Sequence, residues 1–138
     1  MGYNAMTYDE LIQIPKEWRR LQRDTERIAY LRETVTSLPP MKTSGRVQVS
    51  NLNRSMALVD TLIDAERDVK ERTADMKRKE QEAFEIFLDI KEPEHRVLWL
   101  HYCRHLTIVD IAEIMYISPR WGYMLRKRGL AIVKERLK

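Results

Sequence analysis

Residues 107–136 (TIVDIAEIMYISPRWGYMLRKRGLAIVKER) decide how the C-terminal third of the chain folds. Thr107, with Asp110 three residues later, resembles a capping box that opens a helix. Ser118 followed by Pro119 is an N-cap with a proline in the first turn of a second helix. Only a few residues remain between the two helices, so the stretch predicts a short helix, a tight turn and a longer helix.

This order of elements is the helix-turn-helix pattern, in which the second helix lies in the major groove of DNA. Ala112 is small and lets the two helices approach each other. The side chains placed to fill the space between the helices and to continue the buried stripe are Ile111, Met115, Ile117, Leu125, Leu130 and Val133. The side chains left to face outward are Arg120, Trp121, Tyr123, Met124 and Lys127.

The positive charge of the protein is concentrated in the same region. The 138 residues carry a formal net charge of +4, yet residues 1–90 hold 15 basic and 16 acidic side chains. Residues 118–138 hold seven basic side chains against Glu135 alone. Such a concentration suits a polyanionic partner, and a solvated basic helix without a partner is the alternative.

Composition narrows the fold class to all-α. Only 4 glycines and 5 prolines interrupt a chain rich in helix-forming residues, and 33% of the residues are charged. No apolar run approaches the roughly 20 residues of a membrane span, and the chain starts without a basic and then apolar leader. Cys103 is the one cysteine, so an intramolecular disulfide is excluded, and we expect a cytoplasmic protein.

The N-terminal part of the chain predicts two long helices, of which the first covers residues 8–38. Its apolar residues recur at spacings of three, four and seven, which is typical of an amphipathic helix. Pro39 and Pro40 end this helix, because proline lacks the backbone donor and disfavours the α conformation at the preceding residue. Residues 39–54 are rich in turn-forming residues and predict a loop.

The second long helix is predicted over residues 55–90 and carries a coiled-coil seam. Its apolar heptad positions are Leu62, Val69, Met76, Ala83 and Ile90, joined by Val59 and Phe87. Glu66, Thr73 and Glu80 interrupt the seam, so the helix needs a partner. We favour an antiparallel hairpin with residues 8–38, and a homodimer through the long helices stays open.

Pro93 ends the second long helix and can take the first position of a third helix, which is predicted to reach about Arg104. The chain thereby divides into a long-helix region, residues 1–90, and a helix-turn-helix domain, residues 91–138. The expected fold is all-α, with a long antiparallel helical hairpin followed by this C-terminal domain.

Four short motifs in this domain match a known pattern. They are V-L-x-L-x-Y, L-T-x-x-D-I-A-E-I-M, I-S and a later G-L. On these motifs, residues 94–137 resemble the fourth conserved region of sigma-70 family factors, which reads the −35 promoter element. With its long helices and short length, the whole chain is similar to small phage-encoded sigma-factor-like regulators of late transcription. The resemblance implies a transcription regulator in a bacterial host cell, with double-stranded DNA and RNA polymerase as partners.

The resemblance also implies which side chains contact DNA. Base contacts fall near the start of the second, recognition helix, and backbone contacts fall on Thr107 and nearby basic residues. The expected DNA-binding residues are Thr107, Pro119, Arg120, Trp121, Tyr123, Met124, Lys127 and Arg128. Arg120 can form bidentate hydrogen bonds to guanine, whereas Met124 offers only an apolar contact, for instance to a thymine methyl group. The DNA sequence preferred by the family therefore does not transfer to this chain.

Four positions depart from the family pattern. His105 and Tyr116 stand where glycine is common. Gly122 and Gly129 stand where the recognition helix usually buries larger side chains, and a glycine inside a helix costs about 0.5–1 kcal/mol relative to alanine. These two glycines are seven residues apart and share a helix face. They either admit close packing of a neighbouring helix or leave the recognition helix loose until DNA orders it.

The remaining candidate sites are weak. His101, Cys103 and His105 alternate along a helix, which turns the cysteine away from both histidines, so we expect no metal site. We expect the cysteine in the core and both histidines near the DNA backbone or solvent. The carboxylates of the second long helix accompany no nucleophile and no glycine-rich loop, so we expect a solvated face, no cofactor and no enzyme.

Two functional classes remain. The first is a sequence-specific DNA-binding transcription regulator whose long helices dimerise or hold RNA polymerase. The second is a protein-interaction module that binds RNA polymerase or another regulator without specific DNA binding. The basic recognition helix favours the first class.

Overall fold

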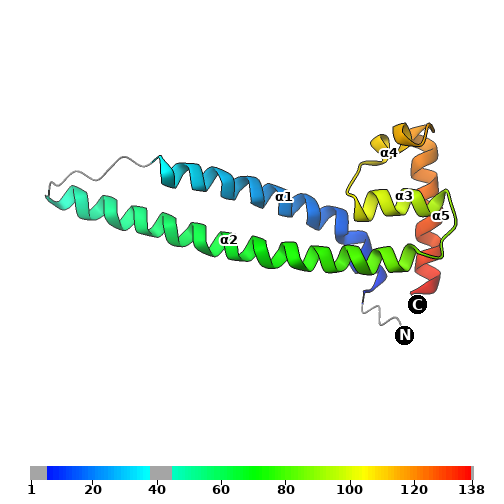
Figure 1. The fold of residues 1–138 in the computed structure, drawn as a ribbon, viewed down its shortest axis with the longest axis horizontal. Coiled ribbons are helices and arrows are strands. Elements are labelled where there is room, and N and C mark those ends of the chain that lie inside the picture. Colours follow the sequence, from blue (N-terminus) through cyan, green and yellow to red (C-terminus); the bar gives the residue numbers. More distant parts are fainter. Residues whose placement is uncertain (1–5, 38–44, 138) are drawn as a thin grey trace. The chain divides into compact units, whose positions relative to one another are not determined.

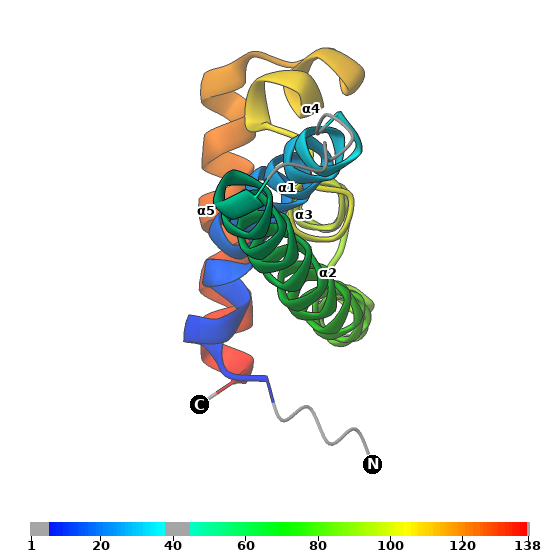
Figure 2. The same cartoon turned by 90° about the vertical axis from the view of Figure 1, so that its left-hand side faces the viewer.

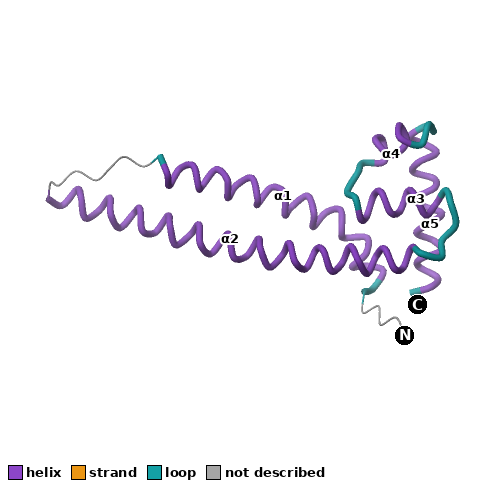
Figure 3. The backbone as a smooth tube through the Cα atoms, viewed as in Figure 1, coloured by secondary structure: helices purple, strands orange, loops and turns teal. Residues whose placement is uncertain are grey.

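The computed structural model describes residues 6–37 and 45–137. This part of the chain contains helices and connections but no strand, so the predicted all-α class is confirmed (Figure 3). The helices are α1 (Tyr8–Thr36), α2 (Gly45–Phe87), α3 (Glu94–Leu98), the π-helical turn η1 (Trp99–Cys103), α4 (Ile108–Ile114) and α5 (Pro119–Arg136) (Figure 1). Over the same residues, no helix combines the length and the apolar character that crossing a bilayer requires.

Contacts divide the chain into two compact units. The first unit combines Met1–Trp18 with Asp75–Lys138, and the second comprises Arg19–Ala74. Both long helices contribute residues to both units. A division between residues 1–90 and residues 91–138 stays a prediction, and that boundary lies inside the first unit.

In the second unit, two ion pairs join α1 to α2. Arg72 Nη1 lies 2.6 Å from Asp24 Oδ2, and Arg32 forms an ion pair with Glu66 further along the two helices. Glu66 is one of the polar residues that interrupt the predicted seam, and this ion pair accommodates its charge. Exposed pairs of this kind contribute only about 0–1 kcal/mol, so buried apolar side chains such as Ile28 supply the larger share of the stabilisation.

The predicted loop over residues 39–54 is wrong from Gly45 onward. Helix α2 already begins at Gly45, while residues 38–44 lie outside the described residues. Turn-forming residues here do not break the helix, because adding a residue to an existing helix gains one hydrogen bond without a new nucleation cost. No proline stands between Pro40 and Pro93 to stop the helix from extending.

The predicted third helix is divided into α3 and the π turn η1. Pro93 is the N-cap of α3 and does not take its first position. The hydrogen bonds of η1 enclose one more residue per turn than those of an α-helix, which widens the helix. The residues buried on α3 and η1 are Val97, Leu98, Leu100 and Tyr102. This burial raises the pKa of the Tyr102 hydroxyl to about 12.

The core of the first unit joins five helices. The largest fully buried side chains are Phe87, Leu11, Ile14, Leu98, Ile111, Leu125, Val97 and Val133. They come from α1, α2, α3, α4 and α5, and burying each one stabilises the fold by roughly 1.5–3 kcal/mol. The first turns of α1 and the end of α2 are therefore part of the same packed body as α4 and α5.

Candidate nucleic-acid interface

The two short-range caps predicted for α4 and α5 are confirmed. Thr107 Oγ1 accepts a hydrogen bond of 3.2 Å from the backbone N–H of Asp110 and so caps α4. Ser118 Oγ accepts one of 3.1 Å from Trp121 N–H and caps α5. Pro119 occupies the first turn of α5, where its missing N–H leaves no hydrogen bond unmade. The caps set where each helix starts and therefore which residues face outward.

The turn between α4 and α5 is a Schellman motif. The N–H of Ile117 donates to the carbonyl of Ala112 at 2.9 Å, and the N–H of Tyr116 donates to the carbonyl of Glu113 at 3.3 Å. Tyr116 has a φ of 56°, and His105, which follows η1, has a φ of 60°. These are left-handed conformations, which glycine adopts without a steric cost. This is a physical reason why glycine is common at both positions in the sigma-like pattern, although this chain has His and Tyr there.

Both glycines of α5 lie where a neighbouring helix comes close. A Cβ at Gly122 would lie 3.0 Å from Ile108 Cγ2 and 3.7 Å from the Ala112 Cβ. A Cβ at Gly129 would lie 2.7 Å from Cδ1 and 2.9 Å from Cγ of Leu98. Of the two interpretations left open by the sequence, close helix packing is the one the structure contains. This packing fixes α5 against α3 and α4.

All the expected DNA-contact residues are exposed. They are Thr107, Pro119, Arg120, Trp121, Tyr123, Met124, Lys127 and Arg128. Three of them are large apolar or aromatic side chains, namely Trp121, Tyr123 and Met124, which are 39–47% exposed. Their exposure on one helix leaves them available to a partner.

Most cations of α5 have no carboxylate partner in the part of the chain that the structure describes. Among the described residues, no carboxylate forms an ion pair with Arg120, Arg126, Lys127, Arg128 or Lys134, whereas Arg136 pairs with Asp89 at 3.0 Å. Two of the cations stack on aromatic rings instead: Arg126 lies 5.2 Å from the centre of the Tyr123 ring, and Arg128 lies 5.0 Å from that of Trp121. Stacking restrains a guanidinium group while its N–H edge stays free to bind an anion.

A groove runs beside α5 and is closed on one side by Tyr8 of α1. Its lining residues are Tyr8, Tyr123, Arg126, Lys127, Leu130, Ala131 and Lys134. The ammonium group of Lys134 lies 5.7 Å from the centre of the Tyr8 ring. Figure 2 shows the first turns of α1 beside the C-terminal half of α5. Tyr8 was not predicted from the sequence, because a contact between residues more than 100 positions apart leaves no local signal.

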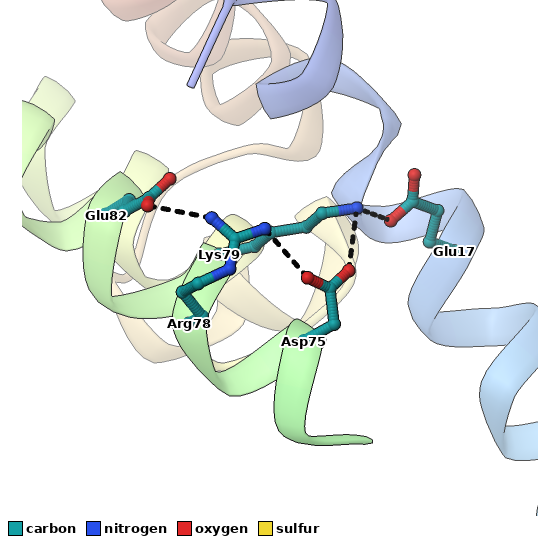
Figure 4. A network of polar contacts seen from close by, with 5 residues as sticks. All are labelled: Glu17, Asp75, Arg78, Lys79 and Glu82. Carbon is teal, nitrogen blue, oxygen red and sulfur yellow. Dashed lines mark hydrogen bonds and ion pairs between the residues drawn. The ribbon is translucent and has the colours of Figure 1, made fainter. Parts of the chain in front are cut away.

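The charges on α2 are arranged differently. Lys79 Nζ lies 2.8 Å from Glu17 and 3.3 Å from Asp75, and Arg78 bridges Asp75 and Glu82 (Figure 4). The hydrogen bond from Arg78, together with one from Lys79, holds the pKa of Asp75 below its usual value. The network neutralises the basic residues that it contains.

The expected position of His105 near the DNA backbone or solvent is wrong. Its ring stacks on Trp18 at 4.6 Å between centres, and its Nε2 is hydrogen-bonded to Glu80. Its side chain is 9% exposed, and its Nδ1 has no hydrogen-bond partner among the described residues. His105 therefore belongs to the packing of α1 and α2 against the segment before α4 and does not reach the exposed face of α5.

The neighbouring residues His101 and Cys103 also have local roles. His101 Nδ1 is hydrogen-bonded to the carbonyl of Leu106 at 2.8 Å. Cys103 is half-buried and not fully in the core as expected, and its thiol donates to the carbonyl of Glu80 at 3.4 Å. Burial raises the pKa of this thiol to about 12. Across residues 6–37 and 45–137, no three His, Cys, Asp or Glu side chains converge to hold a metal ion.

Comparison with protein-family models, with curated proteins and with solved structures finds no match for this chain. The likeness to the fourth region of sigma-70 factors therefore stays a prediction from the motifs. A proposal for the function of this chain therefore rests on the geometry of its own side chains, above all on the exposed face of α5.

Proposed function

We propose that the protein is a transcription regulator that binds double-stranded DNA, with α4 and α5 acting as a helix-turn-helix and α5 lying in the major groove. The observation that carries the proposal is the face of α5, where exposed cations that pair with no carboxylate of the described residues lie beside exposed aromatic side chains. Free Lys and Arg side chains release counterions when they neutralise phosphates, which supplies most non-specific affinity for DNA.

Base reading is assigned to the first two turns of α5. Arg120 lies there, exposed, next to the capped start of the helix. In helix-turn-helix proteins this end of the second helix meets base edges, and an arginine pairs with guanine through two hydrogen bonds. Lys127 lies two turns further on, where the helix leaves the groove, and we assign it to phosphate.

The long helices are proposed to act as an antiparallel hairpin that holds a partner, either a second copy of the chain or RNA polymerase. The support is the pairing of α1 and α2 in the second unit, together with apolar residues of α2 that stay exposed. These residues are Met56, Val59 and Ile63. Their spacing of three and four places them on one side of α2. Promoter binding and a bacterial host are expectations that rest on the sigma-like motifs alone.

A protein-interaction module without specific DNA binding is the second candidate. It is favoured by exposed apolar side chains on α4 and in the turn that follows it. Val109, Ile114 and Tyr116 are 53%, 54% and 96% exposed there. Exposed apolar groups of this kind often mark a contact with another protein.

Selection from a pool of randomised duplexes at physiological salt tests the proposal. Enrichment of one motif by the full chain, and loss of that enrichment in Arg120→Ala, is the expected result. Val109→Ser serves as the control, because it alters the apolar surface of α4 and leaves α5 intact. If no motif is enriched although the chain is folded, specific DNA recognition is excluded and the interaction module takes its place.

A further inference from the structure

The groove between Tyr8 and α5 continues the face that we assign to DNA. Tyr123, Lys127, Leu130 and Lys134 follow one another at spacings of four, three and four residues, so they form one stripe along α5. The stripe is about 16 Å long at 1.5 Å per residue. It begins among the proposed base-reading residues and ends at Tyr8 of α1.

The groove lining combines apolar surface with cationic side chains. Leu130, Ala131 and the two tyrosine rings supply the apolar surface, and Arg126, Lys127 and Lys134 supply the positive charge. None of these three cations forms an ion pair with a carboxylate of the described residues. Asp9 and Glu10 follow Tyr8 in the first turn of α1 but do not line the groove. The groove therefore presents uncompensated positive charge beside apolar surface.

This chemistry matches a sugar–phosphate strand. Each strand of duplex DNA carries one negative charge per about 3.4 Å of the duplex axis, so a stripe of this length can contact more than one phosphate. The deoxyribose rings between the phosphates offer apolar faces to tyrosine and leucine side chains. Tyrosine hydroxyl groups also donate hydrogen bonds to phosphate oxygens.

We propose that this groove holds the backbone of one DNA strand beside the recognition helix, so that the start of α1 is part of the DNA-binding surface. Tyr8 and Lys134 are the residues assigned to this second contact, and Lys127 joins it to the recognition face. The inference rests on the proposed DNA binding and adds a site to it. An acidic protein segment is the other occupant that the charge would suit, but the continuity with Tyr123 and Lys127 favours DNA.

Two measurements on the full chain test the site. The first is the salt dependence of affinity for a randomised duplex between about 50 and 200 mM salt, where each phosphate contact accounts for about a threefold loss. Lys134→Ala should lose about threefold less affinity over this range than the wild type, and Lys134→Arg should restore the wild-type dependence. Lys77→Ala removes an equally exposed charge from α2 and should behave as the wild type.

The second measurement is photo-crosslinking. Tyr8 is replaced by p-benzoylphenylalanine, which should crosslink to duplex DNA, whereas the same replacement of Tyr30, an exposed tyrosine outside the groove, should not. Thermal melting shows whether each variant is folded.

Either of two results overturns the site while the proposed function stands. One is an equal salt dependence for Lys134→Ala and Lys77→Ala, and the other is no crosslink from position 8. In both cases Arg120→Ala should still lose affinity for the preferred site, so the proposed function stands. The groove would then be assigned to an acidic protein segment. If the folded wild-type chain binds no duplex at all, the proposed function fails and the site falls with it.

Discussion

Helices α2 and α5 are both rich in Arg and Lys but place these residues in different surroundings. On α2, Arg72, Arg78 and Lys79 each pair with carboxylates, so their charge is neutralised within the protein. On α5, Arg136 is the one cation that pairs with a carboxylate of the described residues. The difference teaches that the surroundings of the cations on a helix, and not their number alone, decide how much positive charge the helix offers to a polyanion.

Apolar residues of α2 and α5 also differ in their surroundings. The same substitution at one methionine of each helix should show this difference, with the largest expected change in stability. Met76 on α2 is 6% exposed, and Met124 on α5 is 39% exposed. Met76→Asp places a charge in the core and should destabilise the protein by at least about 3 kcal/mol. Met124→Asp should change stability by less than about 0.5 kcal/mol, because the site is exposed, but should weaken DNA binding.

Urea unfolding followed by circular dichroism measures the first effect, and a duplex binding titration measures the second. Equal loss of stability in both variants would contradict the assignment of α5 as a surface for a partner.

Gly129→Ala tests whether α5 is packed tightly against α3. We expect it to have the next largest effect on stability. The added methyl group would meet both Cδ1 and Cγ of the fully buried Leu98, within 2.9 Å. Overpacking costs about 1–3 kcal/mol, and the better helix propensity of alanine returns at most about 1 kcal/mol. Gly122→Ala makes a milder contact, 3.0 Å from Ile108 Cγ2 and 3.7 Å from the Ala112 Cβ, and should cost less than Gly129→Ala. Similar melting temperatures for the two variants would show that α5 is packed loosely.

Tyr116→Gly should act in the opposite direction. Tyr116 has a φ of 56° and is 96% exposed, so the substitution relieves backbone strain and removes almost no contact. Glycine adopts this conformation without strain, which stabilises the folded protein, but its greater entropy in the unfolded chain offsets part of that gain. We therefore expect a net stabilisation of about 0.5–1 kcal/mol. A lower melting temperature for this variant would mean that the tyrosine ring makes a stabilising contact.

The smallest effect concerns the ion pairs of α2. The pKa of Asp75 is held below 3.8 in the folded protein, so the carboxylate stabilises the fold above that pH and the contribution is lost as the pH falls through its folded pKa. Since the side chain is 47% exposed, the contribution is only a few tenths of a kcal/mol. Asp75→Asn should therefore be slightly less stable than the wild type at pH 7 and equally stable in acid. A difference that persists at low pH would assign the effect to packing.

Local sequence signals predicted the elements of the candidate nucleic-acid interface well. The caps at Thr107 and Ser118 are short-range hydrogen bonds that depend on residues three apart, and both are confirmed. The outward direction of Arg120 and Met124 followed from helix periodicity once the start of α5 was set by its cap. Such features are encoded within a few residues of each other.

Features that depend on the whole fold were not predicted. The extension of α2 to Gly45 depends on a helix already formed downstream, and the π turn at Trp99–Cys103 depends on the core that it fills. The burial of His105 against Trp18 and the contact of Tyr8 with Lys134 join distant parts of the chain. Periodicity and capping depend on residues a few positions apart, so they do not predict contacts between distant parts of the chain.

The most direct test of the central claim compares Arg120→Ala with Lys127→Ala on the selected duplex and on a scrambled duplex over a range of salt concentrations. We predict that Arg120→Ala costs about 1–3 kcal/mol on the selected site and little on the scrambled one. Lys127→Ala should weaken both duplexes by a similar factor and reduce the slope of log affinity against log salt by about one. Equal losses on both duplexes for both variants would contradict the claim, because α5 would then be a non-specific clamp and not a reader of sequence.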